Sequence, residues 1–268
     1  MIDWIRQQMK RGVSSNDRLN IVRESLQILC LKTINDKGYF NHLAFLGGTS
    51  LRILFSLRRF SEDLDFSIYE KTGYELTALV EELRRAFHFY NIPLETKEKS
   101  EGNVQNVMMK FTGLLKELGL SALAEQKLSI KLEMDMNPPA GWNLENTLIT
   151  KTYLFNITHY DLPSLYAGKL HACFFRKFTK GRDFYDFAWY LGGKIKPNFL
   201  LLNNAILQTE KKHKKITKKN FKDFLLQSIQ KIDFNAVKKD VERFLEDKTE
   251  LGIFNAKTIR STIERTCS

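Results

Sequence analysis

A short segment near residue 45 constrains the fold more than any other part of the chain. Residues 43–46 form an apolar run, Gly47 and Gly48 follow it, and apolar residues then recur at helical spacing. This order predicts a strand, a glycine turn and a helix, with Thr49 or Ser50 as the helix cap. The bare backbone of the two glycines permits close approach, and the N–H groups that open a helix attract an anion. The segment therefore predicts a phosphate site.

The strand predicted next carries two carboxylates on one face. Residues 63–68 alternate polar and apolar, so Asp63 and Asp65 lie opposite Leu64 and Phe66. Two carboxylates about 4 Å apart repel by roughly 1 kcal/mol in water and about 4 kcal/mol at an effective dielectric of about 20. A cation relieves this repulsion, and Mg²⁺ or Mn²⁺ fits because both take hard oxygen ligands together with substrate phosphates. The alternative is a surface hairpin with two solvated aspartates.

Together, the two segments resemble a known family. The string FLGGTSLR…RRFSEDLDFS resembles the AbiEii/AbiGii-type toxins of the nucleotidyltransferase (DNA polymerase β-like) superfamily, which belong to abortive-infection and type IV toxin–antitoxin systems. The resemblance implies an α+β fold, with a mixed β-sheet flanked by helices and a helical C-terminal domain. It also implies that Asp63 and Asp65 hold metal and that the nucleotide is bound by Gly47, Gly48, Thr49, Ser50 and Arg52.

A third carboxylate is expected from a later strand. Residues 128–136 alternate cleanly, which places Lys131, Glu133 and Asp135 on the face opposite the apolar residues. By the resemblance, a strand beside Asp-x-Asp completes the acidic metal site. Spacing leaves Glu133 and Asp135 open, and we favour Glu133 because it is further from the prolines that end the strand. The alternative is an edge strand that carries salt bridges.

A second motif lies in the helical part of the chain. A helix that starts at Leu162 is predicted to carry Lys169, Arg176 and Lys180 on one face, without acidic partners. The segment SLYAGKLHACFFRKFTKGRDFYDFAWYL resembles the second motif block of the same toxins. By that resemblance Lys169 binds phosphate, Asp186 or Asp183 orients the lysine or the nucleotide, and Arg176 and Lys180 join the nucleotide site. The plainer interpretation is a solvated basic face, a helix cap and a structural salt bridge. His171 is expected to be a packed histidine.

Composition bounds the remaining choices. The 268 residues divide best where sheet patterns give way to helical ones, into residues 1–150 and residues 151–268. No secretory or membrane-spanning pattern is visible, and three cysteines at unrelated spacings are typical of buried thiols in a reducing cytoplasm. The net charge of +11 favours an acidic partner, nucleic acid first, although the lysine-rich run 211–219 is equally consistent with a solvated loop.

These observations favour a metal-assisted enzyme that transfers NMP from an NTP to RNA, with tRNA first, and that acts as a toxin with a cognate antitoxin encoded nearby. A small-molecule or protein acceptor is the first alternative, because one fold serves several acceptors. A non-catalytic nucleotide- or RNA-binding protein is the second. The complete acidic set argues against a non-catalytic protein, and the basic C-terminal region argues against a small acceptor.

Overall fold

The chain folds into two compact units, which are described separately. The computed structural model describes residues 1–11, 14–176, 180–210 and 214–267. The sheet unit comprises residues 1–54, 60–138 and 145–159. The helical unit comprises residues 55–59, 139–144 and 160–268. Two short segments that precede residue 150 therefore belong to the helical unit.

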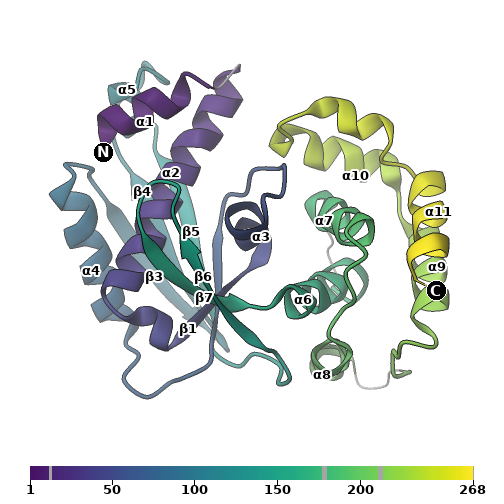
Figure 1. Cartoon of the computed structure of the whole chain (residues 1–268). Helices are drawn as coiled ribbons and strands as arrows, with labels where there is room; N and C mark the ends of the chain where they lie inside the picture. Colours follow the sequence, from purple (N-terminus) through teal and green to yellow (C-terminus); the bar gives the residue numbers. More distant parts are fainter. Residues whose placement is uncertain (12–13, 177–179, 211–213, 268) are drawn as a thin grey trace. The chain divides into compact units, whose positions relative to one another are not determined.

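The sheet unit is built on seven strands in the order β3-β4-β5-β2-β1-β7-β6 (Figure 1). Their bounds are β1 Leu43–Leu46, β2 Leu64–Ile68, β3 Glu95–Glu101, β4 Val104–Phe111, β5 Leu128–Asp135, β6 Leu144–Ile149 and β7 Phe155–Tyr160. β2 pairs antiparallel with β1 and parallel with β5, so the sheet is mixed. This confirms the predicted fold class.

Burial explains why these segments become strands. The apolar residues of β5 are buried and the polar ones between them half-buried, as the period-two pattern predicts. β3 lies at one edge of the sheet and reads ETKEKSE, a row of exposed charges of both signs that discourages edge-to-edge association. β3 begins at Glu95, two residues after Pro93, which has no N–H to donate to the ladder.

The described residues of the sheet unit also form the α-helices α1 Ile2–Met9, α2 Ser15–Asp36, α3 Gly47–Phe55, α4 Leu76–Phe89 and α5 Leu114–Glu117. α2 starts with a capping box, in which the side chains of Ser14 and Asp17 each accept from the other's backbone N–H. α2 packs against α1 and α4, and apolar side chains from these helices and the strands form one core.

The helical unit contains α6 Leu162–Phe174, α7 Gly181–Gly192, α8 Phe199–Thr209, α9 Phe221–Ser228, α10 Phe234–Val241 and α11 Ala256–Thr266. Asp161 caps α6 by accepting from the Ser164 N–H, and Pro163 lies in the first turn, where its missing N–H costs nothing. α7 packs against α6, α10 and α11. Its Tyr190 ring stacks on that of Tyr166, with centroids 4.3 Å apart.

The helix that begins at Leu162 is shorter than the sequence predicts. α6 ends at Phe174, and the rings of Phe174 and the next residue, Phe175, both pack on Phe224 of α9. Successive residues point about 100° apart on a helix, so reaching one ring with both favours leaving the helical path. Arg176 and Lys180 therefore lie outside this helix, and the predicted cationic face shared with Lys169 is wrong.

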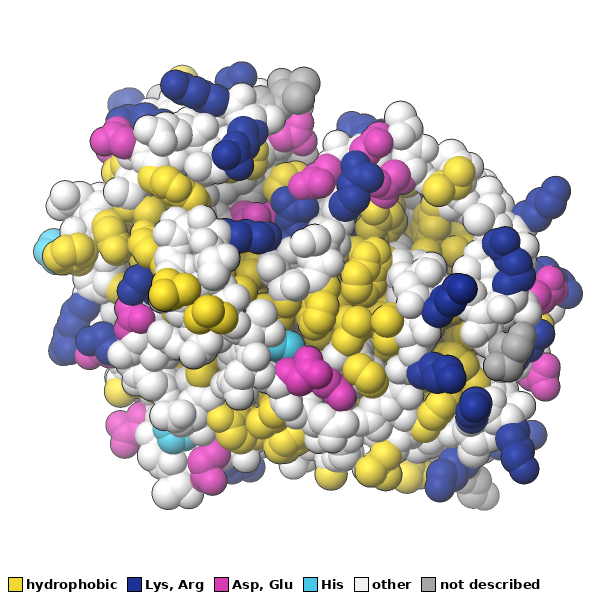
Figure 2. All heavy atoms as spheres, in the orientation of Figure 1, with side chains coloured by type: hydrophobic (Ala, Val, Ile, Leu, Met, Phe, Trp, Pro, Cys, Tyr) yellow, Lys and Arg dark blue, Asp and Glu magenta, His cyan; other side chains and the backbone are white. Residues whose placement is uncertain are grey.

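Charge is divided unequally between the two units. The sequence of the helical unit has 24 Lys and Arg residues against 12 Asp and Glu, whereas that of the sheet unit has 18 against 19. Figure 2 shows Lys and Arg side chains spread over the visible face of the helical unit, with few acidic ones between them. In the described part of the chain, no helix combines the length and apolar character needed to cross a membrane. The three cysteines are free thiols, two of them buried.

Candidate active site

The two aspartates of the Asp-x-Asp motif lie beside the glycine turn. Asp63 directly precedes β2 and Asp65 is its second residue, and both are half-buried. In the antiparallel pairing Asp65 lies opposite Leu46, the residue before Gly47. A Cβ added at Gly47 would lie 2.1 Å from an Asp65 carboxylate oxygen, and Gly47 has φ +81°, which disfavours other residues. Gly47 therefore makes room for the Asp65 carboxylate.

The hydroxyl groups at the start of α3 are used inside the protein. α3 begins at Gly47, so Thr49 and Ser50 are helical residues and not the predicted cap. The Thr49 hydroxyl donates to the Asp63 carbonyl, and the Ser50 hydroxyl donates to the Gly47 carbonyl at 2.8 Å. Both side chains are fully buried. Thr49 thus ties the first helical turn to the backbone that carries the first aspartate.

The strand register distinguishes the two candidates for a third carboxylate. Asp65 lies opposite Glu133 in the parallel β2–β5 pair, whereas Asp135 lies opposite Ser67. Asp135 accepts the Asn137 N–H at 2.9 Å, closing the turn that ends the strand, and burial, partly offset by this bond, raises the pKa of its carboxyl. Glu133 forms an ion pair with Lys131. Glu133 is therefore the carboxylate that lies beside Asp65.

The oxygen atoms around Asp63, Asp65 and Glu133 fit a magnesium ion that is bound partly by the protein and partly by a substrate. On the far side of Glu133, the register places Asn106 of β4, whose buried side-chain oxygen has no hydrogen-bond partner among the described residues. No group of three or more His, Cys, Asp or Glu side chains is arranged around a metal in the described part of the chain. Mg²⁺ needs only one or two carboxylates plus substrate phosphates. Asp63 and Asp65 supply those carboxylates. The arrangement therefore fits a Mg²⁺ site completed by substrate phosphates better than a site made only of protein ligands.

Arg52, a predicted nucleotide residue, is engaged elsewhere in the sheet unit. Its Nε donates to the Glu24 carboxylate at 2.6 Å, and its guanidinium lies 4.3 Å from the centre of the Phe60 ring. The side chain retains only 14% of its exposed surface. These contacts hold α3 against α2, and the role of Arg52 towards a nucleotide stays a prediction.

The second motif forms a buried cluster of four charges in the helical unit. The Lys169 ammonium lies 2.6 Å from an oxygen of Asp183 and 2.8 Å from one of Asp186. Arg59 binds both oxygens of Asp186, Nε at 2.5 Å and a terminal nitrogen at 2.6 Å. Helical spacing alone indicated no acidic partner for Lys169, which is wrong, whereas the resemblance assigned Asp186 or Asp183 to orient the lysine or the nucleotide. Asp183 and Asp186, one turn apart on α7, both lie against the ammonium.

Charges in this cluster cancel, which explains how it is tolerated inside the protein. Burial opposes ionisation of Lys169, yet Asp183 and Asp186 outweigh it and raise the pKa of the ammonium. Burial likewise opposes ionisation of Asp183, but Lys169 lowers the pKa of its carboxyl below the usual value. Both members of the Lys169–Asp183 pair are therefore stabilised in their charged forms. Lys169 is therefore a permanent cation.

Arg176 and Lys180, the other predicted cations, line a separate cavity of about 550 Å³. They flank residues 177–179, which lie outside the described residues. Lys231 and Asp233 contribute from the segment before α10, and Phe184 of α7 provides an apolar wall. The cavity therefore combines cationic side chains with an aromatic surface. The nucleotide role of Arg176 and Lys180 stays a prediction.

His171 is a packed histidine, as expected. Its Nε2 lies 3.0 Å from the Thr209 hydroxyl, and its ring stacks on that of Phe175. Burial, with Arg176 nearby, lowers the pKa of the imidazole to about 4. The ring is therefore neutral near pH 7 and faces no carboxylate partner in these contacts.

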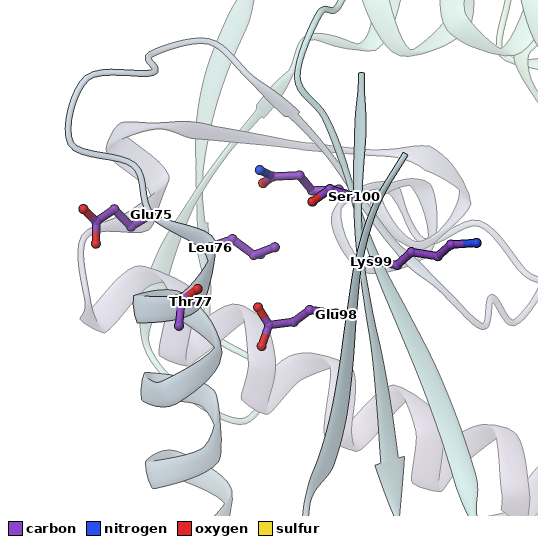
Figure 3. A pocket seen from close by; sticks show the side chains of 7 residues that line it. Glu75, Leu76, Thr77, Glu98, Lys99 and Ser100 are labelled. Carbon is purple, nitrogen blue, oxygen red and sulfur yellow. The ribbon is translucent and has the colours of Figure 1, made fainter. Parts of the chain in front are cut away.

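A further cavity, of about 450 Å³, lies in the sheet unit between the start of α4 and β3. Figure 3 shows Leu76 and Glu98 pointing into it and Lys99 pointing away. None of the residues that line it belongs to the predicted site. It therefore adds nothing to the candidate active site.

The cluster includes one residue that the sequence analysis missed. Arg59 precedes Asp63 by four residues, inside the quoted motif, and no local pattern indicates that its partner is on α7, 127 residues later. A buried aspartate on an apolar helix face was the available signal, because such a carboxylate needs a cation. Asp63, Asp65 and Glu133 lie in the sheet unit, and the four-charge cluster lies in the helical unit. That both act on one nucleotide stays a prediction.

Comparison with known proteins identifies relatives of this chain. The model of a family described as the nucleotidyl transferase AbiEii toxin of type IV toxin–antitoxin systems matches residues 29–263. The crystal structure of JHP933 from Helicobacter pylori is 21% identical, with 92% of this chain and 94% of that one covered and a TM-score of 0.54. A second Helicobacter pylori structure is 21% identical, with 91% and 95% covered and a TM-score of 0.49. No curated protein matches.

Proposed function

Because the chain belongs to the AbiEii family of nucleotidyltransferase toxins, we propose that it transfers NMP from an NTP to RNA, with tRNA as the first acceptor, in a Mg²⁺-dependent reaction. The observation that carries the proposal is the half-buried Asp63 and Asp65 pair, for which Gly47 leaves room. Family membership also implies a cognate antitoxin. We expect the protein to act in the cytoplasm, where NTPs and tRNA are found.

Asp63 and Asp65 hold the metal in this proposal, and Glu133 is the neighbouring third carboxylate. The in-register pairing of Asp65 with Glu133 supports that choice over Asp135. A bound Mg²⁺ neutralises charge on the phosphates. The acceptor hydroxyl attacks the α-phosphorus in line, a carboxylate of this set accepts the hydroxyl proton, and pyrophosphate leaves. Gly47 and Gly48, with the first N–H groups of α3, bind phosphate oxygens.

Lys169 binds phosphate as a cation in this proposal. Two of its three N–H donors point at carboxylates, at 2.6 and 2.8 Å, which leaves one for a ligand. Because Asp183 and Asp186 raise the pKa of the ammonium, it carries no free lone pair near pH 7. A covalent lysine–nucleotide intermediate is therefore disfavoured, and direct transfer to the acceptor is favoured.

The charge of the helical unit supports a nucleic acid acceptor. Its excess of Lys and Arg over Asp and Glu suits phosphate contacts along a strand, and a small acceptor needs no such surface. Transfer to a small molecule or protein remains the second candidate. Retention of Asp63, Asp65 and Glu133 argues against a binding protein without catalysis.

One experiment tests the proposal. The protein is incubated with each labelled NTP, Mg²⁺ and total cellular RNA, and the labelled species is identified. Label in tRNA supports the proposal, and label in a small molecule or protein instead redirects it. Calorimetry of NTP binding with Mg²⁺, Zn²⁺ or EDTA tests the metal separately. Equal NTP affinity in EDTA and Mg²⁺ would remove the metal from binding.

A further inference from the structure

We propose that Arg59 is a positioning residue for Lys169 and that it acts through Asp186. This inference rests on the proposed phosphate-binding role of Lys169. Arg59 hydrogen-bonds to Asp186, which in turn pairs with the Lys169 ammonium, so the carboxylate connects the two cations. Its side chain is 2% exposed and that of Asp186 is 0% exposed, whereas Lys169 and Asp183 retain 11% and 10%. The cluster therefore has an inner pair and an outer pair.

The two oxygens of Asp186 bind different sets of cations. Among the described residues, one oxygen of Asp186 accepts from Arg59, and the other accepts from both Arg59 and Lys169. A planar guanidinium that binds both oxygens fixes the plane of the carboxylate, which a single-point cation does not do. The direction from which Asp186 receives the ammonium is therefore set by Arg59.

Arg59 also limits how strongly Asp186 holds the ammonium. With Arg59 present the cluster has two cations and two anions. Without it, two buried carboxylates share one cation, and both oxygens of Asp186 are open to Lys169. The ammonium is then drawn inwards, and more of its charge is neutralised before a phosphate arrives. We therefore expect loss of Arg59 to weaken phosphate binding by Lys169 without removing Lys169.

The backbone around Arg59 is anchored within the helical unit. Arg59 forms a β-bridge with Leu245, and the Arg58 carbonyl accepts the Glu246 N–H at 3.3 Å. The Arg58 guanidinium lies 3.1 Å from the Glu250 carboxylate. These contacts anchor both Arg58 and Arg59, so the backbone that carries the Arg59 guanidinium is held in place.

Arg59→Gln and Arg59→Lys test the proposal. A matched control, Leu202→Ala, removes buried apolar surface from α8 of the same unit and changes none of the four charges. We expect Arg59→Gln to lower kcat/KM for transfer by about tenfold to a hundredfold, less than removal of a direct donor. Arg59→Lys restores the charge and most of the melting temperature, but not the transfer rate, because lysine lacks the fork.

A purely structural role predicts a different pattern. In that case activity follows the folded fraction, so Leu202→Ala, Arg59→Gln and Arg59→Lys all keep the activity of the wild type at temperatures where they are folded. Transfer is measured below the onset of unfolding of every variant. Arg59→Lys with the kcat/KM of the wild type overturns the proposal.

NTP affinity without acceptor separates this inference from the proposed function. If the wild type transfers label and the Arg59 variants behave as Leu202→Ala does, the inference fails and the function stands. If the wild type binds NTP but labels no RNA, the acceptor proposal fails, and weaker NTP binding by Arg59→Gln than by Leu202→Ala still supports the inference. Absence of NTP binding by the wild type overturns both.

Discussion

The two units hold their acidic motif residues at different degrees of burial. In the sheet unit Asp63 and Asp65 are half-buried beside the space left by Gly47, next to a strand that contributes Glu133. In the helical unit Asp183 and Asp186 are buried and neutralised by two cations. Carboxylates that keep some exposure can accept a metal or a proton, whereas carboxylates inside a neutral cluster can only orient their partners. The difference separates ligands from scaffold.

The two units also differ in net charge. The near-neutral sheet unit has slightly more acidic than basic residues, whereas the helical unit has twice as many basic as acidic ones. The buried four-charge cluster contributes nothing to that excess because it sums to zero. The positive charge of the helical unit is therefore available at its surface for a polyanion.

The largest expected effect comes from the half-buried aspartates of the sheet unit. Asp65→Asn should lower transfer by more than about a thousandfold, because losing a metal ligand removes several kcal/mol of stabilisation and 1.4 kcal/mol is tenfold. The protein should stay folded, with an unchanged or higher melting temperature, since one of two clustered carboxylates becomes neutral. A transfer assay beside a thermal melt measures both. Active Asp65→Asn protein would refute the catalytic assignment.

Lys169→Met tests the buried side. Transfer should fall about a hundredfold to a thousandfold, as for loss of a single electrostatic donor. Stability should also fall, by about 3 to 5 kcal/mol, because two buried carboxylates lose their shared cation. Denaturant unfolding and a transfer assay give the two numbers. Lys169→Arg keeps the charge and is the control; equal stability of Lys169→Met and wild type would contradict the cluster.

Gly47→Ala should affect both activity and stability. The added methyl group meets the Asp65 carboxylate, and the positive φ costs about 1 to 3 kcal/mol. Displacing a ligand by about 1 Å should lower transfer about a hundredfold. Gly102→Ala, also at positive φ but with open space around the added Cβ, is the matched control. Similar transfer by the two variants would show that room for Asp65 is unimportant.

A smaller effect is expected from surface lysines. Lys218→Glu combined with Lys219→Glu should weaken RNA binding a few-fold and flatten its salt slope by about 2, sparing NTP affinity. Both belong to the predicted basic run 211–219, of which residues 211–213 lie outside the described residues. Lys71→Glu combined with Lys97→Glu makes the same charge change in the sheet unit. Equal loss in both pairs would mean that the units do not differ in RNA binding.

The smallest effect concerns pH. Burial lowers the pKa of His171 to about 4, below its usual value near 6.5, so the folded state binds fewer protons than the unfolded state between these values. The stabilisation is complete above pH 6.5 and is lost as the pH falls towards 4. The melting temperature of the wild type should therefore drop more between pH 7 and pH 5 than that of His171→Asn. Parallel melts of both proteins measure this difference.

Local patterns were sufficient to predict most of the sheet unit. The clean alternation in β5 and the Gly-Gly turn before α3 each state their structure within about ten residues, and the strand pairing then followed the resemblance. The side-chain interactions were less accessible. Thr49 was expected at a helix cap and instead donates to the Asp63 carbonyl, because α3 starts two residues earlier.

Prediction was weakest for the helical unit, and the reason is sequence distance. The end of α6 depends on Phe224, about fifty residues beyond Phe174 and Phe175, and the pairing of Asp186 depends on Arg59. Helical spacing alone placed Lys169, Arg176 and Lys180 on one face. Local periodicity contains no information about partners of this kind, so the error was in tertiary contacts and not in the motif residues.

The position of Arg59 bears on how the protein is made. During synthesis, residues 55–59 emerge long before Asp186, and the bond between them closes across 127 residues. Contacts this distant in sequence form slowly because loop closure must precede them. The first half of the chain can therefore acquire its strands while Arg59 still waits for α7. For the same reason, a cut at residue 150 would leave Arg59 in one fragment without its carboxylate and Asp186 in the other without its guanidinium.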